Sequence, residues 1–369
     1  MNELSKISVV LPSLDPDEKL VAVIDGLLEH GFTDIILVND GSKPENLHYF
    51  EDAAAQHPEI HLLHHPVNRG KGAALKTAFN WFLENRPEAA GVVTVDGDNQ
   101  HHPEDTRACA LRMLETGKII LGCRDFSLPH VPPRSRFGNR ITSGIFKIFV
   151  GMTLSDTQTG LRAVPARDIK PLTEVYGDRF EYETNMLLAM KDQNLPYEEV
   201  KIRTVYIEEN KSSHFRAVRD SWRIYKLILG HFFRYSISAI VSAVVDTGLY
   251  ALLSALLNGV LSGVLLTGAA VVVARAVSSL CNFFMNKKLV FQSNVDTGKA
   301  MLRYYMIAIP NMLLQLGFTQ GVYALFNIPD TAIFLRSLLY VVVMCVLFVL
   351  TFVLQQRWVF AGKKSRNED

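Results

Sequence analysis

The stretch VVTVDGDNQH, residues 92–101, decides the fold of the first half of the chain. Its first four residues, 92–95, have high β-propensity and no charge, and the chain turns polar directly after them. A short apolar run that ends in turn residues is typical of a strand buried within a sheet. Asp96 and Asp98 then stand one residue apart, and two carboxylates supply hard oxygen ligands for a divalent cation. The stretch therefore predicts a buried strand that carries an acidic loop to the edge of a sheet.

Short apolar runs alternate with helical patterns on both sides of this stretch, from residue 7 to about residue 205. The alternation predicts an α/β fold with a Rossmann-like, mostly parallel sheet. Ligands of such sheets bind at the carboxyl ends of the strands. Carboxylates follow three predicted strands, at Asp15, Asp40 and Asp96, and we expect them to meet in one crevice. The turn NRGKG, 68–72, precedes a helix, and its backbone N–H groups and two cations suit a phosphate.

The chain as a whole is nearly neutral, with 38 Lys and Arg against 37 Asp and Glu, and 49% of its residues are hydrophobic. Near-neutrality argues against a nucleic-acid-binding protein, and the apolar content argues against a disordered chain. Between residues 232 and 360 the charges nearly vanish, and four apolar segments occur, at 233–257, 262–285, 303–326 and 332–354. Each can cross about 30 Å of hydrocarbon at about 1.5 Å per residue. The second half is therefore predicted to be an α-helical transmembrane domain with four spans.

Basic residues decide how these spans are oriented. The link between the second and third spans and the tail after the fourth carry Lys and Arg, whereas the other two links carry none. The positive-inside rule then predicts that both chain ends lie in the cytoplasm. The first eleven residues are too short and too charged for a secretory signal. The four cysteines form no CxxC pair, and we expect them to be reduced.

The apolar half contains a short repeat. Residues 286–291 read NKKLVF and residues 355–360 read QQRWVF, each at the predicted cytoplasmic exit of a span. The likeness indicates two related helical hairpins, although anchoring by interfacial aromatic and basic residues explains it as well. Asp246 and Arg275 fall within predicted spans, where we expect them to face the bundle interior as partners, in a structural pair or a substrate-handling role. Arg336, near a span end, is expected to extend to the interface.

Both halves resemble known families. The polar half, over residues 1–215, resembles family 2 glycosyltransferases of the GT-A fold, of the polyprenyl- or dolichyl-phosphate sugar synthase kind. Seven motifs carry this resemblance in order: Pro12-Ser13, Asn39-Asp40-Gly41-Ser42, residues 68–72, residues 96–101, Gly122-Cys123-Arg124, Ser135-Arg136 with Asn139, and residues 155–162 (SDTQTGLR). The apolar half resembles the GtrA-like four-span membrane family through Asn282-Phe283, Asn286 and Val290-Phe291. Together they resemble a bacterial glycosyltransferase fused to a GtrA-like domain.

The resemblance implies roles for individual residues. The donor nucleotide-sugar would be held by Pro12, Asp15, Asp40, Lys71 and Asp96. Mg²⁺ or Mn²⁺ would be bound by Asp96, Asp98 and Gln100. The residues implied in catalysis are Asp98, Asp156, Arg124 and Arg136. The acceptor phosphate would be met by Arg134, Lys211 and His214, since the family's Ser-Lys pair reads Ser213-His214 here. The family's Tyr-Asn-Glu after the first strand reads Leu14-Asp15-Pro16, which departs from its base-recognition contacts.

The implied reaction is inverting transfer of a sugar from a UDP- or GDP-linked donor to polyprenyl (undecaprenyl) phosphate. It would take place on the cytoplasmic leaflet of a bacterial cell membrane, for glycosylation of cell-envelope polysaccharide. A phosphate monoester is largely a dianion at pH 7, so this acceptor hardly needs a general base. We expect Asp156 to orient rather than to abstract a proton, with an essential base as the alternative. Residues 215–231 read as an amphipathic helix with a basic stripe beside a Trp-bearing stripe, which suits an anionic membrane surface or packing on the soluble domain.

The predicted domains are a cytoplasmic glycosyltransferase domain (1–214), a juxtamembrane helix (215–231), a transmembrane domain (232–360) and a cytoplasmic tail (361–369). Three other functions were weighed. A processive polysaccharide synthase would carry Gln-x-x-Arg-Trp, but residues 354–358 begin with Leu. A nucleotidyltransferase would carry a Gly-rich first loop, which is missing here. A lipid-sugar flippase with a regulatory nucleotide-sugar domain stays open, although the donor-site carboxylates argue against an inert domain. The partners predicted are the nucleotide-sugar, the lipid phosphate, the membrane and no nucleic acid; a homo-oligomer is compatible with the sequence.

Overall fold

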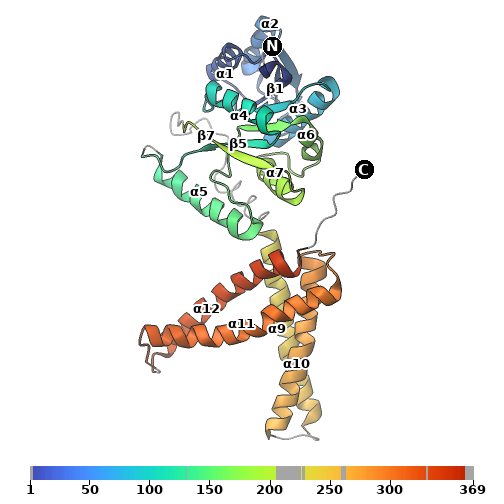
Figure 1. The fold of residues 1–369 in the computed structure, drawn as a ribbon, viewed down its shortest axis with the longest axis vertical. Coiled ribbons are helices and arrows are strands. Elements are labelled where there is room, and N and C mark those ends of the chain that lie inside the picture. The colour runs from blue at the N-terminus through green and yellow to red at the C-terminus, as the bar shows by residue number, and fades with distance from the viewer. Residues whose placement is uncertain are drawn as a thin grey trace. The chain divides into compact units, whose positions relative to one another are not determined.

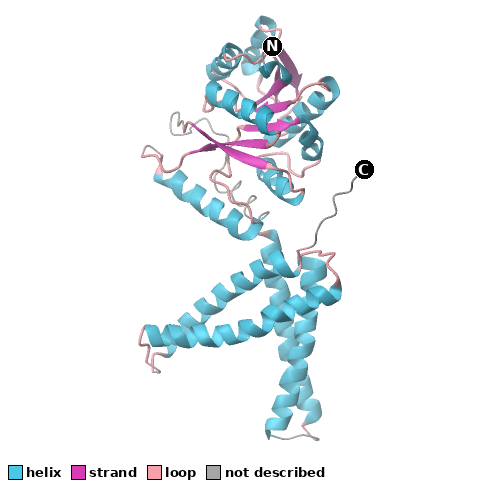
Figure 2. Ribbon diagram, viewed as in Figure 1, coloured by secondary structure: helices cyan, strands magenta, loops and turns pink. Residues whose placement is uncertain are grey.

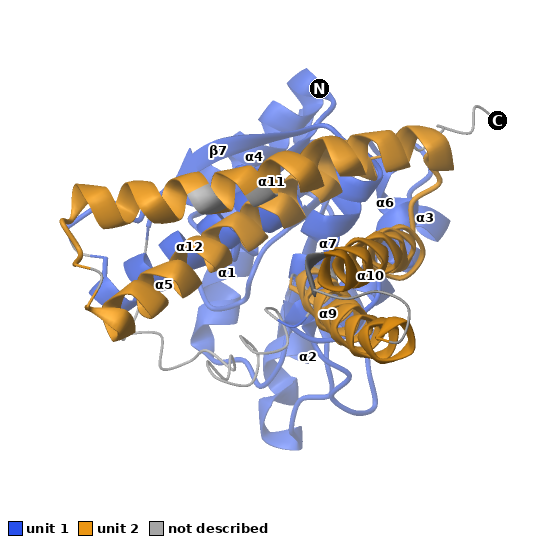
Figure 3. Cartoon of the chain, turned by 90° about the horizontal axis from the view of Figure 1, so that it is seen from below, with its two compact units in different colours: residues 1–228 blue, residues 229–369 orange. Residues whose placement is uncertain are grey.

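The computed structural model describes residues 3–129, 131–204, 226, 229–258, 263–329 and 331–361. The chain divides into two compact units, residues 1–228 and 229–369 (Figure 3). The first unit holds the sheet and the second holds the apolar helices. Two predicted acceptor residues, Lys211 and His214, and nearly all of the predicted amphipathic helix lie outside the described residues.

A seven-stranded sheet forms the centre of the first unit (Figure 2). Its strands are β1 (Ile7–Ser13), β2 (Ile35–Asn39), β3 (Ile60–His64), β4 (Gly91–Thr94), β5 (Ile119–Arg124), β6 (Arg162–Pro165) and β7 (Tyr197–Ile202). They lie in the order β3-β2-β1-β4-β6-β5-β7. β6 runs antiparallel to β4 and β5, and the other neighbouring pairs are parallel. The mostly parallel sheet expected from the sequence is confirmed.

Helices cover both faces of this sheet (Figure 1). The helices that cover it are α1 (Glu18–Glu29), α2 (Leu47–Gln56), α3 (Lys71–Asn85), α4 (Pro103–Thr116), α6 (Ala166–Thr173) and α7 (Glu181–Asp192). The unit also contains α5 (Pro133–Ile145), which lies away from the sheet, and the short helical turns η1 (Glu3–Lys6), η2 (Pro44–Asn46) and η3 (Phe146–Val150). One apolar core lies between the sheet and α3, α6 and α7, and the other lies beneath α1, α2 and α4. Because both faces are covered, β2 and β4 are buried along their whole length, which is why they read as continuous apolar runs.

The order in which successive strands are added to the sheet reverses between β1 and β4. β1 pairs with β2 on one side and with β4 on the other, so the connections that leave these two strands diverge. Such a switch point is where open α/β sheets bind their ligands, outside the carboxyl ends of the strands. The loop after β4 lies close to the end of β1, since a Cβ on Gly97 would come 3.2 Å from the Ser13 Oγ. The acidic loop at 96–98 is therefore at this switch point.

The second unit consists of two helical hairpins. The first is α9 (Gly230–Leu257), α10 (Gly263–Met285) and η5 (Asn286–Val290); the second is α11 (Thr297–Leu325), α12 (Ile333–Leu354) and η6 (Gln355–Val359). Three helical stretches of the described chain are long and apolar enough to cross a membrane: Phe232–Leu257, Leu265–Val290 and Ile333–Val359. α11 covers the third predicted span, but it carries Asn311 and Gln315 among its apolar residues. Its mean hydropathy is therefore lower than that of the three stretches named above. The count of four spans stays a prediction.

The sequence repeat is also a structural repeat. Asn286 and Gln355 are 69 positions apart, each begins a short π-helical turn, and the Asn286 Nδ2 donates a hydrogen bond to the Gln355 Oε1 at 3.0 Å. Phe291 and Phe360, which end the two copies of the motif, stack with ring centroids 5.1 Å apart. Equivalent residues of the two hairpins thus meet each other directly, as they do near a two-fold axis.

Aromatic pairs around this contact repeat the same symmetry. The ring of Phe283 in the first hairpin lies 5.9 Å from Phe360 in the second, and Phe352 in the second lies 5.7 Å from Phe291 in the first. Phe283 of the first hairpin therefore contacts the second hairpin in the same way as its counterpart, Phe352, contacts the first. This reciprocity favours two related hairpins over independent interfacial anchoring. The hairpins diverge from the η5–η6 contact (Figure 1).

Replacing Asn286 or Gln355 with leucine tests whether this contact couples the hairpins. Both side chains are buried, so either single variant leaves a polar group without its partner and should lower the melting temperature in detergent. The double variant should cost less than the two single variants together, with a coupling of about 1 kcal/mol, as found for polar pairs between membrane helices. Thermal unfolding of the four proteins measures it, and strictly additive shifts would contradict the contact.

The two charges predicted within the spans do pair. The Arg275 Nη2 lies 3.1 Å from the Asp246 Oδ2, and the Ser278 Oγ donates to the Asp246 Oδ1 at 2.9 Å. The expectation that both face an interior is wrong for Arg275, whose side chain is 73% exposed. The reason is that the hairpins diverge, so the pair lies along α9 and α10 instead of inside a closed bundle. The Arg336 guanidinium lies 4.3 Å from the ring centre of Tyr323.

Candidate active site

Asp96 follows β4 at the switch point and is held by a lysine and a histidine. The Lys71 Nζ lies 2.7 Å from the Asp96 Oδ1, and the His101 Nε2 lies 3.5 Å from the Asp96 Oδ2. Burial alone would raise the pKa of Asp96, but Lys71 and His101 outweigh it and hold that pKa well below its usual range. Asp96 is therefore ionised at neutral pH.

Two glycines allow this close arrangement. A Cβ on Gly160 would come 2.4 Å from the Asp96 Oδ2, so a larger residue would displace the carboxylate. Gly70, at φ +104°, precedes Lys71, and a Cβ there would come 2.4 Å from the backbone oxygen of Asp178. The segment before α7 thus packs directly against the start of α3, and it brings Glu183 to Lys71.

Asp98 lies in the same loop with one oxygen occupied. Its Oδ1 accepts a hydrogen bond from the backbone N–H of Gln100 at 3.1 Å, across a turn in which Asn99 has φ +59°. Burial, and next the charge of Asp96, raise the pKa of Asp98 above its ordinary value. A cation bound beside Asp96 and Asp98 would lessen this repulsion and favour the ionised form of Asp98.

These residues fit a divalent cation that shares its ligands with a substrate. Within the described part of the chain, no group of three or more His, Cys, Asp or Glu side chains is arranged to enclose a metal. Mg²⁺ is usually bound by one or two carboxylates together with phosphate oxygens and water. Asp96 and Asp98 supply that many carboxylates, and a diphosphate would complete the set.

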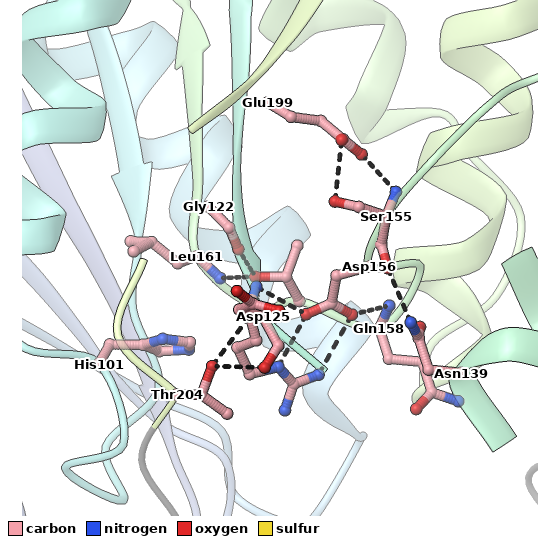
Figure 4. Close-up of polar contacts among 12 residues, drawn as sticks. His101, Gly122, Asp125, Asn139, Ser155, Asp156, Gln158, Leu161, Glu199 and Thr204 are labelled. Atoms are coloured by element: carbon pink, nitrogen blue, oxygen red, sulfur yellow. Dashed lines mark hydrogen bonds and ion pairs between the residues drawn. The ribbon is translucent and has the colours of Figure 1, made fainter. Parts of the chain in front are cut away.

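Asp156 forms a second acidic position, fully buried and paired with Arg124 at the end of β5. The Arg124 Nε donates to the Asp156 Oδ2 at 2.7 Å and its Nη2 donates to the Oδ1 at 3.2 Å. The backbone N–H of Gln158 also donates to the Oδ1, at 2.9 Å (Figure 4). Both oxygens of Asp156 are therefore engaged, and the carboxylate fixes the plane of the guanidinium.

Neighbouring elements hold the Asp156 loop in place (Figure 4). The Asn139 Nδ2, on α5, donates to the backbone oxygen of Ser155 at 2.7 Å. Glu199, on β7, accepts from the Ser155 N–H at 2.7 Å and from its hydroxyl at 2.9 Å. The loop is thus tied on both sides, so Asp156 presents Arg124 in one orientation.

Asp40 and Asp15 lie after β2 and β1, where the sequence predicts them, but both bind backbone. Asp40 is buried and accepts hydrogen bonds from the N–H groups of Arg69 and Gly70, at 3.0 and 2.7 Å, and from the His65 Nδ1 at 2.7 Å. The Asp15 Oδ1 accepts from the N–H of Lys43 at 2.8 Å. These contacts favour positioning roles for both carboxylates. Pro12 is buried within β1, and its backbone pairs with β2.

Two further predicted residues, Arg134 and Arg136, belong to α5, and Gln100 belongs to the loop after β4. The Arg136 Nε and Nη2 donate to the backbone oxygens of Phe126 and Leu128, at 3.0 and 2.9 Å, which ties α5 to the loop after β5. Arg134 is exposed on the first turn of the same helix. Gln100 lies in the Asp98 turn, and its N–H orients the Asp98 carboxylate.

Family models match both parts of the chain. The model of Glycosyl transferase family 2 matches residues 8–160, and the model of the GtrA/DPMS transmembrane domain matches residues 234–360. The chain joins a family 2 glycosyltransferase domain to a GtrA/DPMS transmembrane domain. The GT-A-like fold and the apolar helices expected from the sequence are thereby confirmed.

Several relatives can be aligned with the glycosyltransferase domain. A UDP-N-acetylglucosamine–dolichyl-phosphate N-acetylglucosaminyltransferase of Methanococcus voltae is 26% identical over 219 residues, 55% of this chain and 86% of that protein. An undecaprenyl-phosphate mannosyltransferase of Micrococcus luteus is 24% identical over 171 residues, 45% of this chain and 69% of that protein. Among solved structures, a mannosyltransferase from Pyrobaculum calidifontis with GDP-Man and Mn²⁺ is 14% identical and covers 96% of this chain and 87% of its own, with a TM-score of 0.39.

Three residues of the glycosyltransferase domain were missed by the sequence. His65 supports Asp40, and Glu183 pairs with Lys71. Arg162 is buried, its Nη1 donates to the backbone oxygen of Glu183 at 2.8 Å, and burial lowers its pKa. Each of the partners named here is far away in sequence, so no spacing pattern signals it. Arg162 alone lies in a motif that carried the resemblance, but its neighbours in space could not be read from that motif.

Proposed function

We propose that this family 2 glycosyltransferase moves a sugar from a nucleotide-sugar to polyprenyl phosphate at a membrane. The observation that carries the proposal is the Asp96–Asp98 pair at the switch point of a chain that also has a GtrA/DPMS transmembrane domain. Two relatives that act, by name, on dolichyl and undecaprenyl phosphate support the acceptor class. The donor would be UDP- or GDP-linked.

The donor's diphosphate is the leaving group of the proposed reaction. Mg²⁺ or Mn²⁺, when bound, would neutralise the charge that develops on this group as it departs. Asp98 would offer the cation its second oxygen, because its first is fixed by the Gln100 N–H. Asp96 is held ionised beside it by Lys71 and His101. Contacts within the protein thus fix both carboxylates of this loop, and fixed groups are the condition for electrostatic stabilisation without reorganisation.

The acceptor phosphate is a ready nucleophile, since it is largely a dianion at neutral pH. Its difficulty is repulsion from the donor diphosphate, so it needs a fixed positive group along its approach. Arg124 would supply this group, because Asp156 holds its guanidinium on two bonds. With both oxygens of Asp156 engaged, the carboxylate orients Arg124 and takes no proton. Attack opposite the departing diphosphate inverts the anomeric carbon.

The finer features of the proposal come from the sequence. The positive-inside rule supports a cytoplasmic glycosyltransferase domain and cytoplasmic chain ends, so the acceptor would be used on the cytoplasmic leaflet. In a bacterial cell membrane the acceptor would be undecaprenyl phosphate, and the product would serve glycosylation of cell-envelope polysaccharide.

Transfer assays with the purified full-length protein test the proposal. Radiolabelled UDP- and GDP-sugars are incubated with polyprenyl phosphate and Mn²⁺, and the label is measured in the lipid extract. The expected result is lipid-linked label from one donor, lost when EDTA removes the metal. No transfer from any donor, with scrambling of lipid-linked sugar intact, would replace this function with that of a flippase.

A further inference from the structure

Lys71 already places a positive charge inside the candidate site. Its Nζ lies 2.7 Å from the Asp96 Oδ1 and 2.9 Å from the Glu183 Oε1, and the side chain is 18% exposed. The two carboxylates come from different elements, the loop after β4 and helix α7. Lys71 thus bridges them with one ammonium group, in contact with a residue that we propose as a metal ligand.

The position of Lys71 in helix α3 is unfavourable for a positively charged side chain. Lys71 is the first residue of α3, where the helix macrodipole is positive and a cation is unfavourable. Its ammonium is instead held by carboxylates on both sides, from Asp96 and from Glu183. The site carboxylates therefore keep the ammonium in place, against the preference of its own helix.

This contact has a consequence for metal binding. An ammonium 2.7 Å from the Asp96 Oδ1 neutralises the charge that a divalent cation would use, and repels that cation at short range. Asp98 contributes a second carboxylate from the same loop, and its Oδ1 accepts the Gln100 N–H at 3.1 Å. A metal ion that enters the site without a diphosphate therefore has to compete with the Lys71 ammonium for Asp96. A diphosphate would bring two negative charges to which the ammonium could bind instead.

We propose that Lys71 is a resident counter-cation that makes metal binding depend on the donor. The inference rests on the proposed function. Without a nucleotide, Lys71 weakens the binding of a divalent cation to Asp96 and Asp98. With a nucleoside diphosphate, the ammonium has a second acceptor, so the metal and the nucleotide strengthen each other's binding.

Mn²⁺ binding to the Lys71→Gln variant tests this inference without any measurement of activity. Free Mn²⁺ is followed by electron paramagnetic resonance in titrations of the full-length protein, with and without UDP or GDP. Without nucleotide, the variant should bind Mn²⁺ about tenfold more tightly than the wild type, because a positive charge next to a ligand is gone. The factor by which nucleotide strengthens Mn²⁺ binding should shrink by a similar amount.

Two further variants control for charge and for folding. Lys76→Gln removes a lysine from the same helix that pairs with Asp178 at 2.8 Å, and it should leave Mn²⁺ affinity unchanged. Lys71→Arg keeps the positive charge and should bind Mn²⁺ like the wild type. If Lys71→Gln does not fold, a Lys71→Met variant serves in its place.

The possible outcomes separate this inference from the proposed function. Equal or weaker Mn²⁺ binding by Lys71→Gln without nucleotide overturns the counter-cation role and leaves Lys71 as a structural bridge. Tighter binding by Lys71→Arg overturns it too, because the charge is kept. Absence of Mn²⁺ binding in every protein, with either nucleotide, overturns the proposed metal-dependent donor site along with it.

Discussion

Replacing Asp98 with alanine should abolish metal-dependent sugar transfer and leave the protein folded. The loss in kcat should be at least about a thousandfold, since the variant loses an oxygen ligand at the point where the leaving group gains charge. Stability should not fall, because the raised pKa of Asp98 means that its charge is unfavourable in the metal-free protein. Function and stability thus pull in opposite directions at this residue.

Lipid-extract assays and thermal unfolding without metal measure the two effects of Asp98→Ala. Asp52→Ala, on the exposed side of α2, is the matched control and should change neither. Retained turnover would remove Asp98 from the proposed metal site. A lower melting temperature in metal-free buffer would contradict the view that its charge is unfavourable there.

Replacing Asp156 with asparagine should lower kcat by about a hundredfold or more without removing the response to acid. The variant keeps the shape of the side chain but loses the charge that fixes Arg124 on two bonds. If Asp156 orients Arg124, the fall in rate below about pH 6 belongs to the acceptor phosphate and remains in the variant. Rates measured between pH 5 and 8 provide this test, in a window set by that phosphate.

The companion variant is Arg124→Lys, which keeps the positive charge but cannot bind the carboxylate through two parallel bonds. It should lose a similar factor in kcat, and the double variant should lose little more, because the pair acts as one unit. If the acid limb disappears in Asp156→Asn, Asp156 is the general base. If the losses multiply, the two residues act independently.

The sequence was sufficient for the features that depend on local pattern. A strand that is buried on both faces has a continuous apolar sequence, so residues 92–95 could be identified as such a strand. Asp96 and Asp98 follow it directly. The repeat at 286–291 and 355–360 likewise marked two hairpins that meet through Asn286 and Gln355. The hydropathy of α11 was harder to interpret, since polar side chains in contact with other helices read as interruptions of a span.

Tertiary structure alone decided which partner each charged side chain has. Glu183 reaches Lys71 from a helix more than a hundred residues away in sequence, and Asp40 turns to the backbone of Arg69 and Gly70. Arg275 pairs with Asp246 yet remains exposed, because the hairpins diverge. Local periodicity records which face of an element is buried, whereas the direction and charge state of a carboxylate depend on groups that only the folded chain brings within a few ångströms.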